Sequence, residues 1–420
     1  MINPLRAVHQ ALQENGLRYT LSEMVFQLSD LPAGILFGIY DAISTEHKRD
    51  VVSVVRSNQP EADTYAMLDE IKGTDVDRTL HVFYRTPVHE SQFETWSGDN
   101  DATISRVHSI SSFRALLKSK YVFCKYDSHL RWYRFFDQSD RKYIRLYHGP
   151  ITKAYGNSRT QSDPFSLTDQ MRLFDNSPPY RSVASDVERF FRSSSEGRHP
   201  QRFIRLGYPR FDRLRRLKEN DAKPRISDRV RNKLAMDGDY FNILYAPTRK
   251  DGAYPTTFFP YPDFELSQLR KWCRANNTRI FLRPHPKEDI LLDHLVDGKT
   301  ILFAGQEFVN STSELMPFMD ALITDYSSVY IEFLVFDRPI IFVKDRHSHF
   351  DEIRGLAFDF DTYFPGPKPD TFHDFLRSLE DAMDGSESYE NDRTFVRKTF
   401  LPPTDRTFFE GVQDYFSKYK

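Results

Sequence analysis

Residues 322–333 read LITDYSSVYIEF, so an acid and two hydroxyls stand where one apolar run ends and the next begins. If residues 321–324 form a strand and 328–336 a helix, Asp325, Ser327 and Ser328 lie in the turn between them. A serine in that turn can cap the helix, because its hydroxyl accepts from a free N–H of the first turn. The same N–H groups and the helix dipole favour a bound phosphate. Both interpretations stay open, although an isolated Ser-Ser pair is more often a simple cap.

A second candidate is the stretch FLRPHPKED at residues 281–289. Arg283 and His285 lie two positions apart, so they share one face if the strand continues, and the prolines stiffen the chain there. Arginine offers a fork of donors that suits a pyrophosphate, and histidine can donate a hydrogen bond or a proton. The alternative is an ordinary loop with a surface histidine, but the rigid Pro-His-Pro favours the functional interpretation.

A third candidate is LYHGPITKAYG at residues 146–156. His148 directly follows a predicted strand, and the neighbouring Gly149 lets a ligand approach the backbone. Histidine titrates near neutral pH, which makes His148 a candidate general base, and Lys153 is a candidate phosphate contact. The alternative for His148 is a half-buried imidazole that is hydrogen-bonded to the main chain, the commoner role of a single histidine.

A fourth candidate is ILYAPTRKDG at residues 243–252. It places Thr248, Arg249 and Lys250 where a predicted strand ends, so their donors could meet a phosphate. The alternative is a basic turn on the surface.

Motifs of several other chemistries are missing from the sequence. It contains no Walker-type glycine-rich loop, no G-x-G-x-x-G and no G-x-S-x-G. Cys124 and Cys273 are far apart and lack metal-ligand spacing. The stretch DRHSHFDEI puts His347, His349 and Asp351 at alternate positions, but a polar loop is the simpler interpretation. We therefore expect neither a cofactor nor a metal ion.

The chain must also supply elements that position these residues. Its 420 residues are enough for two domains, and 39% of them are hydrophobic. A net charge of −2 argues against a basic nucleic-acid-binding surface. The start lacks the pattern of a signal peptide, and no run approaches the roughly 18 apolar residues of a membrane span. We expect a soluble cytoplasmic protein, with peripheral attachment to the inner face of the cell membrane left open.

The second half of the chain has a regular pattern of short apolar strands and helices. Strands are expected at residues 203–207, 241–248, 279–286, 319–325 and 338–343, and an amphipathic helix at 263–276. This alternation predicts an α/β fold with a parallel sheet, in which ligands bind beyond the carboxyl ends of the strands. The earlier part predicts strands at 34–43, 120–126 and 142–149, helices at 110–120 and 182–193, and a polar surface excursion at 88–105.

The order of these stretches resembles one known family. Together they resemble the CDP-glycerol glycerophosphotransferases, which build or prime teichoic-acid-like poly(alditol phosphate) chains. The resemblance extends over about residues 113–376 and rests on the blocks YHGPITKAYG, GYPRFDRL, ILYAPTRKDG, RPHP, ALITDYSSVYIEFLVFDRPIIF and YFPGP.

The resemblance implies a GT-B-like fold, in which two Rossmann-like domains face each other across a cleft. We expect an N-terminal α/β domain on the acceptor side at residues 1–190, a C-terminal Rossmann-like donor domain at 200–390, and a helical segment at 391–420. The family's two functional histidines correspond to His148 and His285, and its Asp-Ser-Ser segment corresponds to Asp325, Ser327 and Ser328.

The chain departs from the family pattern at several positions. Pro150 stands where the family usually has threonine, and Tyr147 stands where it has a bulky aromatic. Arg249 and Lys250 replace an aromatic followed by arginine, and Glu332 stands where an aspartate is frequent.

The resemblance implies a transferase that moves an alditol phosphate from a CDP-alditol to an acceptor hydroxyl and releases CMP. The acceptor is expected to be lipid-linked or a glycan, in surface-polymer biosynthesis, with no nucleic acid partner. Glycerol and ribitol both stay open as the alditol. Two alternatives remain: a GT-B glycosyltransferase that uses a nucleotide sugar, and a non-catalytic binding protein of a surface-polymer assembly.

Overall fold

The structure is a computed structural model of the 420-residue chain. It describes residues 28–45, 49–55, 62–72, 80–84, 102–125, 131–147, 149–158, 179–224, 232, 234, 238–248, 256–285, 292–306, 308–309, 311–344 and 355–418. The chain divides into two compact units. Unit 1 comprises Met1–Gly149, Ser162–Val183 and His199–Arg205, and unit 2 comprises Pro150–Gln161, Ala184–Arg198 and Leu206–Lys420. The domain ranges predicted from the sequence, 1–190, 200–390 and 391–420, stay a prediction.

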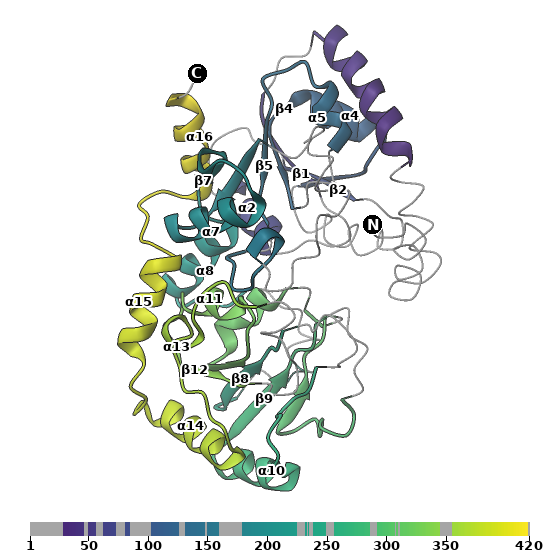
Figure 1. Ribbon diagram of the computed structural model, residues 1–420. Helices are drawn as coiled ribbons and strands as arrows, with labels where there is room; N and C mark the ends of the chain where they lie inside the picture. Colours follow the sequence, from purple (N-terminus) through teal and green to yellow (C-terminus); the bar gives the residue numbers. More distant parts are fainter. Residues whose placement is uncertain are drawn as a thin grey trace. The chain divides into compact units, whose positions relative to one another are not determined.

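Unit 1 contains a seven-stranded sheet in which all neighbouring strands are parallel. The strand order is β3-β2-β1-β4-β5-β6-β7, so the chain starts in the middle, moves to one edge and then fills the other side. This is the order of a doubly wound sheet. The strands are β1 (Arg49–Val55), β2 (Leu80–Tyr84), β3 (Ala102–Arg106), β4 (Ser119–Cys124), β5 (Lys142–Arg145), β6 (Tyr180–Val183) and β7 (Phe203–Arg205) (Figure 1).

Of the described helices of unit 1, only α4 (Ile110–Lys118) was predicted from the sequence patterns. The others with complete bounds are α2 (Ala62–Lys72) and α5 (Arg131–Phe136). The predictions of a helix at 110–120 and of strands at 120–126 and 142–149 are confirmed by α4, β4 and β5. The predicted surface excursion at 88–105 is wrong at its end, where β3 begins, and residues 88–101 lie outside the described part.

The prediction of a strand at residues 34–43 is wrong, because residues 28–43 are helical. The residues that face inward recur with helical spacing, at positions 30, 33, 34, 37 and 38. Phe37 is buried and packs against the rings of Phe113 and Tyr133. The apolar run suggested a strand, but the burial period is that of a helix.

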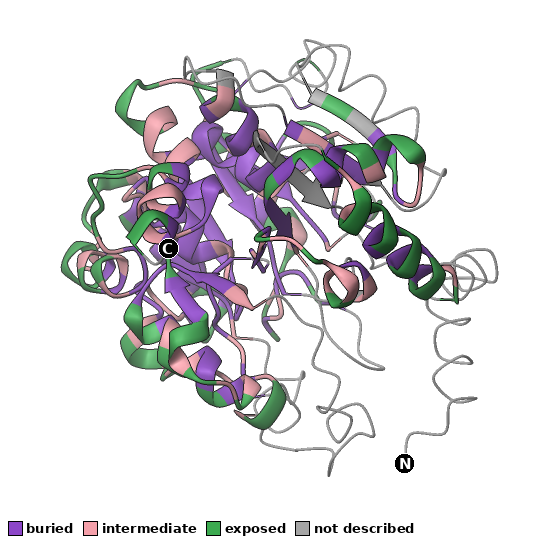
Figure 2. Ribbon diagram, turned by 90° about the horizontal axis from the view of Figure 1, so that it is seen from above, coloured by how far each residue is buried: buried purple, intermediate pink, exposed green. Residues whose placement is uncertain are grey.

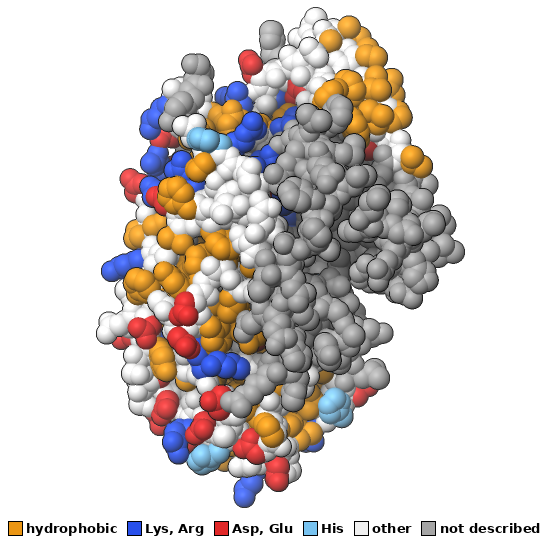
Figure 3. All heavy atoms as spheres, viewed as in Figure 1, with side chains coloured by type: hydrophobic (Ala, Val, Ile, Leu, Met, Phe, Trp, Pro, Cys, Tyr) orange, Lys and Arg blue, Asp and Glu red, His pale blue; other side chains and the backbone are white. Residues whose placement is uncertain are grey.

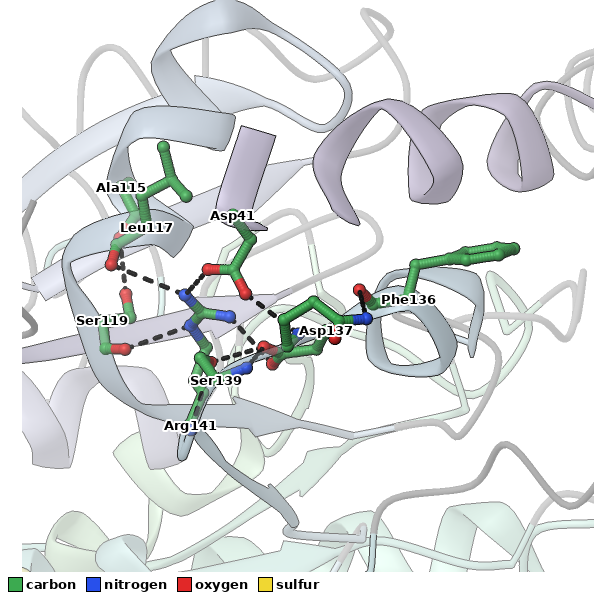
Figure 4. Close-up of polar contacts among 9 residues, drawn as sticks. Asp41, Ala115, Leu117, Ser119, Phe136, Asp137, Ser139 and Arg141 are labelled. Atoms are coloured by element: carbon green, nitrogen blue, oxygen red, sulfur yellow. Dashed lines mark hydrogen bonds and ion pairs between the residues drawn. The ribbon is translucent and has the colours of Figure 1, made fainter. Parts of the chain in front are cut away.

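A buried guanidinium joins four segments of unit 1. Arg141, just before β5, donates to Asp41 at 2.9 Å and to Asp137 at 2.8 Å. Its Nε also donates to the main-chain oxygen of Ser119 at the start of β4, at 3.1 Å (Figure 4). These bonds fix the helix at 28–43 and the end of α5 to the sheet. Losing either carboxylate would leave buried positive charge less compensated.

Unit 2 contains a five-stranded parallel sheet of order β10-β9-β8-β11-β12. Its strands are β8 (Phe241–Tyr245), β9 (Thr278–Leu282), β10 (Ile301–Phe303), β11 (Ala321–Thr324) and β12 (Ile340–Phe342). These confirm the strands predicted at 241–248, 279–286, 319–325 and 338–343, with shorter bounds. The sheet interior is apolar and fully buried, as at Ile243, Ile280 and Ile323 (Figure 2).

Helices and short 3₁₀ turns surround this second sheet. The helices are α7 (Asp186–Glu196), α8 (Pro209–Glu219), α10 (Leu266–Ala275), α11 (Val329–Phe333), α13 (Phe360–Tyr363), α14 (Phe372–Asp384), α15 (Glu390–Phe400) and α16 (Phe408–Lys418). The 3₁₀ turns within the described residues are η3 (Gly156–Ser158), η5 (Pro200–Arg202), η6 (Thr312–Glu314) and η7 (Met316–Phe318). The helices predicted at 182–193 and 263–276 are confirmed as α7 and α10, whereas the one predicted at 328–336 is the shorter α11.

Within the described residues, no helix has the length and apolar character needed to cross a bilayer. Both units contain a parallel sheet, which confirms the α/β class predicted from the sequence.

Candidate active site

The centre of the candidate site is the point where the strand order of the second sheet reverses, between β8 and β11. Ligands of doubly wound sheets bind beyond the carboxyl ends of the strands at such a point. Thr248 follows β8 and Asp325 follows β11, and the Thr248 N–H donates to Asp325 Oδ1 at 2.7 Å. The Ser327 N–H donates to the same oxygen at 3.2 Å. Asp325 is buried and therefore braces the two strand ends against each other.

Thr248 brings a hydroxyl to this point. The residue is 2% exposed, and its Oγ1 has no hydrogen-bond partner within the part of the chain that the structure describes. A buried hydroxyl without a partner costs about 1–3 kcal/mol. A ligand oxygen at the switch point would therefore gain a donor from Thr248 that no described residue uses.

The two serines after β11 differ in their contacts. Ser327 Oγ accepts from the Val329 N–H at 3.5 Å, which is long for a helix cap. Ser328 occupies the N-cap position of α11 but makes no capping hydrogen bond with its side chain. Both serines are half-buried. A simple cap thus accounts weakly for Ser327 and does not account for Ser328.

Arg283 and His285 follow β9 at the same edge of the sheet. The Arg283 N–H donates to Tyr245 O at 2.9 Å and so extends the pairing of β9 with β8. Its buried Nη1 donates to the carbonyl oxygens of Ala304 and Gly305, both at 2.8 Å, where the chain leaves β10. This nitrogen therefore holds the neighbouring loop. His285 is half-buried two positions further on.

A tyrosine lies beneath this edge of the sheet. The Tyr245 hydroxyl accepts from the Phe259 N–H at 3.1 Å and is buried. Burial, with a smaller contribution from the Asp325 charge, raises the pKa of Tyr245 well above its usual range. Tyr245 therefore stays protonated, and it supports the core rather than exchanging protons.

The segment that follows His148 and Gly149 lies against the turn after β11. Thr152 Oγ1 donates to Tyr326 O at 3.0 Å. The half-buried Lys153 forms an antiparallel bridge with Leu356. Lys153 was predicted from the sequence as a phosphate contact, whereas Thr152 was not, because no local pattern marks it.

Comparison with known proteins decides the family. The sequence model of a family described as CDP-Glycerol:Poly(glycerophosphate) glycerophosphotransferase matches residues 42–415. The chain belongs to this family. The resemblance noted in the sequence motifs is thereby confirmed.

Several curated relatives of this glycerophosphotransferase-family chain are named as teichoic acid enzymes. The chain is 24% identical over 302 residues to the teichoic acid ribitol-phosphate polymerase TarL of Staphylococcus aureus, covering 71% of this chain and 52% of TarL. It is 29% identical over 271 residues to a teichoic acid poly(glycerol phosphate) polymerase of Bacillus spizizenii, covering 60% of this chain and 64% of that protein. The matches thus span about half to two thirds of these relatives.

The fold also matches that of a solved protein. A structure of the wall teichoic acid polymerase TagF superposes with a TM-score of 0.68, covering 96% of this chain and 98% of that chain. The sequence identity over this superposition is 18%, so the likeness concerns the fold.

Glu332, a departure from the usual glycerophosphotransferase pattern, is a structural residue here. Its carboxylate accepts from Arg210 in α8 at 2.8 Å and from the Ser313 hydroxyl at 2.5 Å. All three side chains are buried. Glu332 therefore joins α11 to α8 and η6.

Some predicted site residues of this glycerophosphotransferase-family chain lie outside the described residues. These are the candidate base and two basic residues, His148, Arg249 and Lys250, and the weak metal candidates His347, His349 and Asp351. Among the described residues, no group of three or more His, Cys, Asp or Glu is placed to hold a metal ion.

Proposed function

We propose that the protein transfers an alditol phosphate, glycerol phosphate first, from a CDP-alditol to an acceptor hydroxyl in surface-polymer or glycan synthesis. One observation carries this proposal in a chain of this family: the Thr248 hydroxyl, which has no partner among the described residues, lies beside the turn of Asp325, Ser327 and Ser328. Relatives named for glycerol phosphate and for ribitol phosphate both support an alditol phosphate as the transferred group.

The proposed reaction is a single displacement at phosphorus. An acceptor oxygen forms a bond to the distal phosphorus of the CDP-alditol, the bond from that phosphorus to the bridging oxygen breaks, and CMP leaves with the electron pair. His148 takes the proton of the acceptor hydroxyl. Positioning and charge stabilisation usually dominate phosphoryl transfer.

The donor phosphates are proposed to lie beyond β8, β9 and β11. Donors from Thr248, Ser327, Ser328 and His285 would bind the phosphates, with charge from Lys153, Arg249 and Lys250. Arg283 was predicted to bind the pyrophosphate directly. Because its Nη1 already binds two carbonyl oxygens, we propose that Arg283 acts mainly by fixing the loop beside His285 and by its charge.

We further propose a GT-B arrangement, with the two units facing each other across the substrate cleft. Two parallel sheets, each built outward from its centre, and the TagF likeness over 96% of the chain support it. The same arrangement would suit a glycosyltransferase with a nucleotide-sugar donor, so the donor must be tested directly.

Peripheral contact with a lipid surface is also part of the proposal. The helix at residues 28–43 exposes Leu36, Ile39 and Ile43, among other aliphatic side chains. Figure 3 shows hydrophobic side chains gathered at the upper right, over the helix that is purple in Figure 1. Such a face resembles the apolar side of an interfacial helix.

A donor screen tests the activity. The protein is incubated with acceptors and CDP-glycerol, CDP-ribitol, UDP-sugars or CMP-sugars in turn, and consumption of each donor is measured. We expect CDP-alditol consumption with release of CMP. His148→Ala should still bind CDP-glycerol but lose turnover by about 100-fold or more, the usual contribution of a general base.

The control is His373→Ala, which removes an exposed histidine of α14 and should leave turnover unchanged. Near-normal turnover by His148→Ala would refute the base assignment. Consumption of a nucleotide sugar instead would establish the glycosyltransferase alternative, and tight donor binding without consumption would establish a binding protein.

A further inference from the structure

Thr152 makes a buried hydrogen bond to the turn that carries the candidate phosphate-binding serines. The residue is 2% exposed, and its hydroxyl donates to Tyr326 O at 3.0 Å. Tyr326 lies between Asp325 and Ser327. Its buried ring packs against the ring of Phe360, with the two centroids 5.3 Å apart. The acceptor carbonyl is therefore held in place by a packed side chain and a braced carboxylate.

The chain around Thr152 is held from other directions as well. The Ala154 N–H donates to Gly355 O at 3.0 Å, and the Ala357 N–H donates to Thr152 O at 2.9 Å. The Tyr155 hydroxyl donates to Glu196 in α7 at 2.8 Å. These bonds join the chain to residues 355–357 and to α7. Among these side-chain and main-chain bonds, only that of the Thr152 hydroxyl joins it to the turn after β11.

We propose that Thr152 is a positioning residue, which fixes the segment that follows His148 and Gly149 to the turn formed by residues 325–328. This inference rests on the proposed function. His148 precedes Thr152 by four residues, so chain length alone keeps their Cα atoms within about 14 Å. A general base must approach its proton to about 3 Å, and a misplacement of about 1 Å can cost about 100-fold in rate. Because Asp325 holds the serine turn independently of Thr152, loss of the Thr152 bond should affect turnover more than donor binding.

The test compares Thr152→Val with Thr152→Ser. Valine keeps the shape and removes the donor, whereas serine keeps the donor. With CDP-glycerol and an acceptor, we expect Thr152→Val to lower kcat by about 10- to 100-fold with little change in KM, and Thr152→Ser to restore most of it.

A matched control is Thr278→Val at the amino end of β9. The Thr278 hydroxyl also donates to a main-chain oxygen, that of Asn276, at 3.0 Å, and Thr278 is also 2% exposed. Its substitution should lower Tm as much as Thr152→Val does and leave kcat unchanged. Equal kcat values for the two valine variants, or an effect of Thr152→Val on KM alone, would overturn the proposal.

A second measurement separates this inference from the proposed function. Amide hydrogen exchange of Ala154 and Ala357 reports directly on whether the loop is held, whatever the donor. Exchange at both amides should accelerate by about tenfold or more in Thr152→Val, as local opening becomes easier, and stay unchanged in Thr278→Val. If the wild type consumes no CDP-alditol, the proposed function fails; if exchange is unchanged in Thr152→Val, the role of Thr152 fails.

Discussion

At the scale of single residues, Asp325 shows how an acid can stand beside the proposed phosphate site and act as a structural acceptor. Its Oδ1 accepts from the N–H groups of Thr248 and Ser327, at 2.7 and 3.2 Å. Those bonds orient the Thr248 hydroxyl and the serine turn. A negative charge close to a diphosphate opposes its binding. The Asp325 carboxylate would therefore orient these groups at some electrostatic cost to the binding of a diphosphate.

Substitutions of Asp325 separate these two effects. Asp325→Ala leaves two N–H groups without an acceptor, so it should lower the free energy of unfolding by about 1–3 kcal/mol and raise KM for CDP-glycerol. Asp325→Asn keeps an amide oxygen as acceptor while removing the charge, so KM should stay the same or fall. Denaturant unfolding and steady-state kinetics measure both. Loss of donor binding in Asp325→Asn would mean that the carboxylate itself contacts the ligand.

Asp320→Ala serves as the control for the alanine variant. Asp320 accepts from the Asn242 N–H at 2.8 Å, at the amino end of the same two strands. Its loss should reduce stability to a similar extent and leave KM unchanged, because the described candidates Thr248, Arg283 and Asp325 follow the opposite, carboxyl ends of the strands.

The sequence predicted which residues reach the carboxyl edge of the sheet, but not what each side chain does there. Thr248, Arg283 and Asp325 follow parallel strands, and strand ends are visible as local patterns. Their partners are distant in sequence: Arg283 binds a carbonyl 22 residues away, and Thr152 binds one 174 residues away. Local spacing carries no information about such partners.

At the scale of elements, close helix packing explains the two glycines of the helix at 28–43. A Cβ on Gly34 would lie 2.7 Å from the Trp132 carbonyl carbon, and one on Gly38 would lie 2.5 Å from Phe136 Cβ. Both neighbours belong to α5. The spacing of four residues puts the glycines on one helix face, so the two backbones can approach closely.

Gly38→Ala should therefore destabilise unit 1. The added methyl would also lie 2.7 Å from the Phe136 oxygen, and that backbone cannot move away cheaply. Overpacking of this kind costs about 1–3 kcal/mol, more than the gain of up to about 1 kcal/mol in helix propensity. Thermal unfolding of the variant should show a lower Tm.

Gly411→Ala is the matched control, because Gly411 also lies within a helix, α16. A Cβ there would meet only Leu206 Cδ2, at 3.7 Å. We expect its Tm to stay the same or rise. A rise in Tm for both variants would contradict the close packing of Gly38 on α5.

The same helix shows why a pattern of apolar residues misled the sequence analysis. Its exposed face is as apolar as its buried face, so polar residues do not mark the period. The signal that could have identified the helix was the pair of glycines four residues apart, together with inward positions at helical spacing.

At the scale of the whole molecule, most strands of the second sheet could be predicted from the sequence, whereas several strands of the first sheet could not. β8, β9, β11 and β12 are apolar runs separated by helices and turns, a pattern typical of parallel sheets. In contrast, β1 lies inside its sheet and pairs with both β2 and β4, as Val52 does with Leu80 and Tyr121. Such long-range pairing decides the strand state, and local periodicity does not encode it.

The overall charge bears on the proposed lipid contact. With a net charge of −2, the molecule as a whole has no electrostatic attraction to anionic lipids. Any affinity for a bilayer should then come from apolar burial, at about 1.5–3 kcal/mol for each large aliphatic side chain fully buried. Apolar affinity is insensitive to ionic screening.

Vesicle sedimentation tests this origin of affinity. We compare Leu36→Glu/Ile39→Glu, at positions 60% and 55% exposed, with Phe190→Glu/Phe395→Glu, at 61% and 50%. The first variant should lose binding to phosphatidylglycerol and phosphatidylethanolamine vesicles by about tenfold or more, since about 1.4 kcal/mol corresponds to tenfold, and the second should bind as the wild type does. Wild-type binding should persist between about 0.1 and 1 M salt, although the screening length falls from about 10 to 3 Å. Equal loss in both variants, or release of the wild type by salt, would exclude the helix at 28–43 as an apolar contact.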